Sequence, residues 1–266
     1  MPSDLRPSYP REFSWGGMRI IIVDSHSEIF PYWTGEYLRL KTPLVAVRID
    51  EHHDMNHDSR ALPAREGRYA ADFLSKMISC LEEYSRRWLN EGNFTCPAFH
   101  YGILGALYHL NPREEGIDAY GRVNGDLVLG APRTMEVSTV SGGRRRRWIW
   151  WDHTLTRLRR ESTRVVPVCS RISREEFQRD LEGSRLPVAI GFDLDSLYGM
   201  KESASLEEAL RERSRRVGVF LRCIPNRPRF VCISRSQRPR AYVPPDKVEL
   251  VQEAALGILA GLHGES

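Results

Sequence analysis

The apolar positions of the chain form two kinds of pattern, and their alternation predicts the secondary structure. Segments whose apolar positions recur every three or four residues are typical of helices that pack one face on a sheet. Short continuous apolar runs rich in β-branched residues are typical of buried strands. Strands alternating with helices predict a parallel sheet, because parallel strands need a crossover connection. The predicted strands are residues 18–24, 44–50, 164–169, 187–193 and 229–234.

Capping boxes mark the start of two predicted helices. Ser173 is followed by Glu176, and Ser205 is followed by Glu208, which is the spacing of a capping box. In this motif the serine and glutamate side chains accept hydrogen bonds from backbone N–H groups that have no partner within the helix. Together with the spacing of the apolar residues, these boxes predict helices at residues 29–40, 66–90, 97–110, 173–181, 205–221 and 245–262.

Residues 111–160 break this alternation. They contain short β-prone pieces and a Gly142-Gly143 turn signal, which predict a β-rich excursion, a hairpin on the edge of the main fold. The chain has no internal repeat and no linker. The expectation is an α/β protein with a single domain over residues 1–266, in which helices cover both faces of a mostly parallel sheet.

Composition and length exclude several classes of protein. Hydrophobic residues make up 41% of the 266 residues, as in packed globular proteins. The longest apolar stretches, 18–23 and 256–262, are too short to span a bilayer, and the first 13 residues lack the pattern of a secretory signal. The five scattered cysteines contain no CxxC pair, which argues against a disulfide scaffold and a cysteine zinc site. A cytoplasmic protein that does not contact membranes is expected.

The net charge of +4 is unevenly distributed. Arg144 to Arg147 form a run of four arginines, followed by three tryptophans within the next four residues. Such a run can bind nucleic acid or an acidic peptide, but a charge run alone is a weak indication of either function. A solvated loop is favoured here, and a metal-stabilised nucleic-acid-binding protein without catalysis stays open as an alternative.

Three of the predicted strands end in carboxylates and histidines. Asp24-Ser25-His26 ends the first, residues 50–54 (DEHHD) end the second, and Asp193-Leu194-Asp195 ends the strand at 187–193. Side chains at i, i+2 and i+4 of an extended chain point the same way, and strand ends of an α/β sheet share one edge. Crowded carboxylates and imidazoles repel one another unless a cation lies among them. The candidate metal ligands are His26, Asp50, His52, Asp54, Asp193 and Asp195.

A single ion usually takes fewer than six ligands from a protein. Two ions that share carboxylates are therefore expected. Oxygen donors with a minority of imidazole favour Mn²⁺, with magnesium, iron or cobalt as other choices and structural zinc disfavoured. The cofactor prediction is two Mn²⁺ per chain.

These motifs resemble those of a known family. Residues 50–56 (DEHHDMN) resemble the D-x-H-x-D-x-N signature of arginases and agmatinases, the ureohydrolases. Residues 192–195 (FDLD) look like their F-D-x-D signature, and Asp24-Ser25-His26 resembles their first Asp-His pair. The similarity covers these motifs, in the family's order, and the β-α order from about residue 18 to 251. It is greatest to a divergent, shorter branch, some of whose bacterial members convert arginine to ornithine within a peptide.

The resemblance implies an arginase-like three-layer fold and a role for each ligand. One ion would bind His26, Asp50, Asp54 and Asp193, and the other would bind Asp50, His52, Asp193 and Asp195. Water activated between the ions would attack the guanidinium carbon, giving urea and an amine. Asp54 would relay the proton to the leaving amine, and the family's proton-transferring histidine would be His100, with His53 and His57 as alternatives.

The chain departs from the family's pattern where the substrate is held. Residues 234–239 (SRSQRP) contain no acid, whereas arginases hold the guanidinium with a glutamate beyond a late strand. The segments that bind the charges of a free amino acid are not recognisable, so the substrate-binding residues are unknown and an arginine-containing peptide is favoured over free arginine. A deacetylase-like amide hydrolase and a two-metal phosphoesterase are alternatives. Deacetylases lack carboxylates at the positions of Asp54 and Asp195. The oligomeric state is left open.

Overall fold

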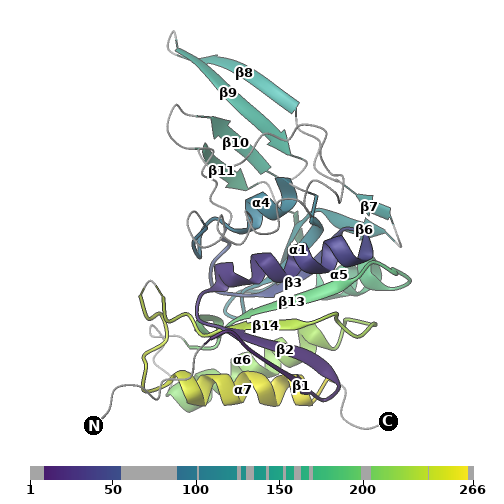
Figure 1. The fold of residues 1–266 in the computed structure, drawn as a ribbon. Helices are drawn as coiled ribbons and strands as arrows, with labels where there is room; N and C mark the ends of the chain where they lie inside the picture. The colour runs from purple at the N-terminus through teal and green to yellow at the C-terminus, as the bar shows by residue number, and fades with distance from the viewer. Residues whose placement is uncertain are drawn as a thin grey trace.

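A computed structural model describes eleven segments of the chain, and its centre is an eight-stranded mixed sheet (Figure 1). The described residues are 9–54, 89–100, 102–124, 127–129, 135–141, 144–151, 154–158, 163–167, 170–198, 205–238 and 240–262. The strands of the sheet, in spatial order, are β1 (Arg11–Trp15), β2 (Met18–Val23), β14 (Val231–Ser234), β13 (Val188–Asp193), β3 (Leu44–Ile49), β4 (Leu104–Leu110), β5 (Ile117–Tyr120) and β12 (Ser170–Ile172).

The five strands from β2 to β4 are parallel, and the edges of the sheet are antiparallel. The predicted parallel sheet is therefore confirmed for the centre, but the whole sheet is mixed. Strand β1 was not predicted, because its sequence lacks an apolar run. It forms a hairpin with β2 through Gly16 and Gly17, whose positive φ angles of 54° and 72° suit a tight two-residue turn.

Helices cover both faces of this sheet, as Figure 1 shows for α1 and α4 on one side and α6 and α7 on the other. The two covered faces explain why β2 is apolar except at the exposed Arg19: Ile21 and Val23 belong to one buried cluster, and Ile20 and Ile22 belong to the other. The helices of the first face are α1 (Ile29–Leu40) and α4 (Thr95–His100), and those of the second are α5 (Arg174–Leu181), α6 (Leu206–Leu221) and α7 (Val248–Ala260).

Both predicted capping boxes are confirmed. At the start of α5, Glu176 N–H donates to Ser173 Oγ, and Ser173 N–H donates to a carboxylate oxygen of Glu176. Ser205 and Glu208 form the same pair of hydrogen bonds at the start of α6. The predicted helix at 66–90 lies outside the described residues, apart from its last two positions.

The helix predicted at 97–110 is wrong. The chain instead forms α4, turns at Gly102 with φ of 70°, and continues as the fully buried strand β4. A left-handed glycine commonly ends a helix. A short run buried on all sides cannot be distinguished as helix or strand from its periodicity alone, which is why the prediction failed.

The excursion is confirmed as β-rich but is larger than a hairpin. Strands β6 (Arg122–Asn124) and β7 (Leu127–Leu129) form one pair. The four-stranded antiparallel sheet that follows contains the strand predicted at 164–169 and the Arg144 to Arg147 run, which lies in a strand rather than a loop. Its strands, in spatial order, are β11 (Thr163–Pro167), β10 (Thr154–Leu158), β9 (Arg144–Trp151) and β8 (Met135–Ser141). Within the described residues, no helix is long and apolar enough to cross a membrane.

The strand order makes the neighbouring strands β3 and β13 a topological switch point of the sheet. From β3 the chain continues to β4 on one side, and from β13 it continues to β14 on the other side. Two adjacent parallel strands whose connections leave in opposite directions open a gap beyond their carboxyl ends, which is where α/β proteins bind ligands. Asp50 directly follows β3, and Asp193 is the last residue of β13.

Candidate metal centre

The six predicted ligands gather at this switch point. His26 begins the short helix η1 (His26–Glu28) beyond β2, and Asp195 lies in η2 (Leu194–Ser196) beyond β13. Four of the six residues, His26, Asp50, Asp193 and Asp195, are no more than 4% exposed. Ionisable side chains buried together in this way require compensating charge.

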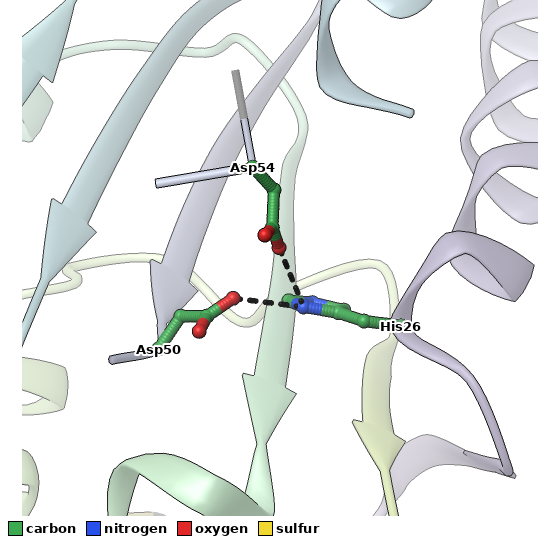
Figure 2. A group of neighbouring side chains, drawn as sticks. All are labelled: His26, Asp50 and Asp54. Atoms are coloured by element: carbon green, nitrogen blue, oxygen red, sulfur yellow. Dashed lines mark ion pairs between the residues drawn. The ribbon is translucent and has the colours of Figure 1, made fainter. Parts of the chain in front are cut away.

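The first group of ligands surrounds one nitrogen of His26 (Figure 2). His26 Nδ1 lies 2.9 Å from Asp50 Oδ2, 3.4 Å from Asp193 Oδ2 and 3.5 Å from Asp54 Oδ2. Three carboxylate oxygens thus converge with one imidazole nitrogen from three separate segments of the chain. We call His26, Asp50 and Asp54 the enclosed half of the centre.

The second group is Asp50, His52 and Asp195. His52 Nδ1 lies 3.1 Å from Asp195 Oδ2 and 3.8 Å from Asp50 Oδ1. Asp50 therefore directs Oδ2 toward the enclosed half and Oδ1 toward this group, as a carboxylate shared between two ions must. We call this group the open half, because the His52 side chain is 52% exposed.

The residues present fit divalent cations. Among the described residues, both ring nitrogens of His26, Asp50 Oδ2 and Asp195 Oδ1 are buried without a hydrogen-bond partner. A buried polar atom that lacks a partner costs free energy, and an ion at these atoms would remove that cost. Carboxylate oxygens with two imidazole nitrogens are a donor set that suits Mn²⁺ and similar ions better than structural zinc.

The pKa values of Asp54 and Asp193 indicate the same need for positive charge. Burial, together with the charge of Asp50, raises the pKa of Asp54 to about 7, and burial and neighbouring carboxylates raise the pKa of Asp193 well above its usual value. Burial lowers the pKa of His26, but the adjacent carboxylates of Asp50, Asp54 and Asp193 outweigh it and raise this pKa to about 10. Without a metal ion, a proton on His26 takes the place of the cation.

Arg48 fixes the loop that carries three of the ligands. Its side chain is fully buried and donates 2.8 Å to Thr95 Oγ1, 3.2 Å to the carbonyl oxygen of His52 and also to that of His53. The guanidinium lies 3.8 Å from the carboxylates of both Asp50 and Asp54. Arg48 was not among the predicted site residues, although a charged residue within the apolar run of β3 was a signal.

Gly191 gives His26 the space that it needs. A Cβ atom at position 191 of β13 would lie 3.1 Å from His26 Nε2 and 3.2 Å from Ile29 Cδ1. On another side the imidazole packs against Phe94, with ring centroids 4.9 Å apart. The glycine in an otherwise bulky strand therefore allows the imidazole to pack directly on the sheet.

Ser236, in the loop after β14, also holds a ligand. Its hydroxyl donates to Asp193 Oδ1, which accepts a second hydrogen bond of 3.3 Å from the N–H of Asp195. The φ of Ser236 is 51°, in the left-handed region that non-glycine residues rarely adopt, so the loop turns sharply at this contact. Sequence patterns contain no signal for this residue.

The histidine predicted to transfer protons is not placed by the structure. His100 is the last residue of α4, but its side chain lies outside the described part of the chain, as does the whole of His57. The His53 ring stacks on His109 with centroids 4.5 Å apart, and its Nδ1 is hydrogen-bonded to Tyr120 Oη. His53 is thus held on the β4–β5 side of the centre and joins neither group of ligands.

No model of a known protein family matches this chain, and no curated protein matches it. An assignment of function to this chain therefore depends on its fold and on the geometry of the candidate ligands.

Proposed function

We propose that the chain is a hydrolase with two divalent metal ions, which cleaves a guanidino C–N bond to release urea and an amine. The observation that carries the proposal is that Asp50 offers one oxygen to each of two groups of ligands at the switch point of the sheet. Two divalent cations held there would lower the pKa of bound water toward neutrality and so supply a nucleophile.

The reaction balances with water as the only co-reactant. The oxygen of water bonds to the guanidino carbon, the bond from that carbon to the substituted nitrogen breaks, and a proton of water passes to the leaving amine. We assign the proton transfer to Asp54, which lies on the enclosed side, 3.5 Å from His26 Nδ1. Arg48 and Ser236 would orient ligands without contacting the substrate.

The substrate that we favour is an arginine side chain within a peptide. The described residues of the loop after β14, 235–238 and 240–243, include no carboxylate. A site for free arginine needs an acidic partner for the ammonium, because an unpaired buried charge costs several kcal/mol. An arginine inside a peptide does not have this charge.

The test is mass spectrometry of an arginine-containing peptide incubated with the manganese-loaded protein, together with a urea assay. Conversion to ornithine lowers the peptide mass by roughly 42 Da per arginine, the expected outcome of hydrolysis at a two-metal site. Asp50→Asn is the control, because it removes one shared oxygen and keeps the size of the side chain. Turnover of free arginine or agmatine but not of peptides would overturn the peptide substrate. Release of phosphate or acetate without urea from suitable esters or amides would overturn the reaction itself.

A further inference from the structure

Solvent reaches the metal centre beside His52. The side chains of the other five candidate ligands are at most 8% exposed, whereas that of His52 is 52% exposed. Among the described residues, the His52 side is therefore the one from which a substrate would reach the candidate ligands.

The described residues of the loop after β14 are held beside His52 by hydrogen bonds. It is joined to the centre by the hydrogen bond from Ser236 to Asp193 and by a 3.1 Å bond from Gln237 N–H to the carbonyl of Asp24. It is closed on itself by Tyr242 N–H, which donates 2.9 Å to Ser236 O, and by the Gln237 side chain, which donates 2.8 Å to Val243 O. The Tyr242 ring consequently lies edge-on to His52, with centroids 5.7 Å apart.

Arg240 is oriented by this tyrosine. Its guanidinium carbon lies 4.6 Å from the centroid of the Tyr242 ring, a stacking arrangement that holds a cation in place and leaves its N–H groups available. The residue is exposed. Arg240 thus contacts Tyr242, which in turn contacts the candidate ligand His52, on the side from which a substrate would approach.

The charge of Arg240 is not compensated as the neighbouring charges are. Arg238, in the same loop, pairs with Asp24 at 2.8 Å, and Arg113, beside the ligand loop, pairs with Glu51. Arg240 has no acidic partner within 4 Å among the described residues. A substrate that brings only the positive charge of a guanidinium would be repelled by this residue.

We propose that Arg240 binds a carboxylate of the substrate, so that the enzyme acts on an arginine next to an acidic residue in a peptide. The inference rests on the proposed function, because it names the substrate class of the same site. A guanidinium presents a fork of N–H donors that matches a carboxylate, and a charge-assisted pair of this kind is stronger than a neutral hydrogen bond. The acidic group also offsets the positive charge of the target side chain.

The experiment compares two peptides that differ only in whether glutamate or glutamine stands beside the arginine. With manganese-loaded protein, the glutamate peptide is expected to have a kcat/KM roughly tenfold higher, mainly through KM. Arg240→Gln should remove this preference. The matched control is Arg222→Gln, since Arg222 is exposed and lies at the end of α6, at the opposite edge of the sheet. This control should keep the preference.

Equal turnover of the two peptides by the unaltered protein, or a preference that survives in Arg240→Gln, would overturn the proposal. If neither peptide releases urea, the proposed reaction fails, and the anion site is then tested by fluorescence anisotropy of the labelled peptides on the manganese-loaded protein. Tighter binding of the glutamate peptide that is lost in Arg240→Gln supports the site independently of the reaction. Equal binding of the two peptides refutes it.

Discussion

The two halves of the candidate metal centre have the same kinds of side chain in different surroundings. In the enclosed half, the imidazole of His26 is fully buried between Phe94 and the bare backbone of Gly191, and a buried arginine lies beside the carboxylates. In the open half, His52 is half exposed and has Tyr242 at its edge. The shared residue is Asp50. One half is thus built into the core, whereas the other is open to solvent at His52, and the surroundings rather than the ligand types distinguish them.

Removing the shared carboxylate tests whether the two halves form one centre. Asp50→Ala should lose both ions and all turnover, because each group of ligands loses an oxygen and the enclosed half also loses the 2.9 Å neighbour of His26. Elemental analysis after manganese loading and gel filtration measures the stoichiometry, with two ions expected for the unaltered protein. One retained ion in Asp50→Ala would show that the halves do not share this ligand.

Arg48 should contribute most to the stability of the protein when metal ions are absent. Replacing it by methionine leaves Asp50 and Asp54 buried without their permanent cation, which should destabilise the metal-free protein by about 3 kcal/mol. Manganese should restore part of this loss, since ions that bind only the folded state stabilise it. The measurement is thermal unfolding with a chelator and with Mn²⁺.

Arg122→Met is the matched control for this change. The Arg122 guanidinium donates to both carboxylate oxygens of Asp180, at 2.7 and 2.8 Å, and Asp180 belongs to neither group of ligands. Its replacement should cost the same stability with and without manganese. If manganese restores the same amount of stability in both variants, Arg48 does not act by compensating the charge of the candidate ligands.

The two halves should also release their ions at different rates. A chelator is expected to remove one ion rapidly through the His52 side and the other slowly from the buried half, because an enclosed ion leaves only when the structure opens locally. His52→Ala should abolish the fast phase, and His26→Ala should abolish the slow one. Stopped-flow release with a manganese-sensitive dye reports both phases. A single phase in the unaltered protein would contradict the distinction between the halves.

Much of the fold could be predicted from the sequence, for identifiable physical reasons. Runs such as those around Ile21 and Val47 have apolar residues on both faces because both faces of the sheet are covered, and the capping boxes mark helix starts through local hydrogen bonds. The candidate ligands were chosen because they follow strands whose ends share one edge. The six candidate ligands come together at that edge, as expected.

What the sequence did not reveal depends on contacts between distant segments. The roles of Arg48, Gly191 and Ser236 arise only when β3, β13 and the loop after β14 are side by side. The break between α4 and β4 was missed because seven successive buried residues carry no helical or strand periodicity. Edge strands such as β1 have too few buried positions to give a signal.

The smallest predicted effect concerns the packing of His26 rather than its chemistry. Gly191→Ala places a methyl group 3.1 Å from Nε2 and 3.2 Å from Ile29, so the imidazole must move by a few tenths of an ångström while every ligand stays present. Displacing a ligand in this way should weaken manganese binding in the enclosed half about tenfold, the range found when groups that orient metal ligands are altered. The open half should keep its affinity. Isothermal titration calorimetry distinguishes the two binding steps.

Gly35→Ala serves as the control, since Gly35 lies within α1 and a Cβ there has nothing within 4 Å. It should leave both affinities unchanged and stabilise the helix by roughly 0.5–1 kcal/mol. If Gly191→Ala instead weakens both binding steps equally, the imidazole and the open half move as one unit, and the difference between the halves lies in exposure alone. If it weakens neither, the side chains around His26 shift to make room for the methyl group. Metal binding then does not require the close approach of the imidazole to the strand.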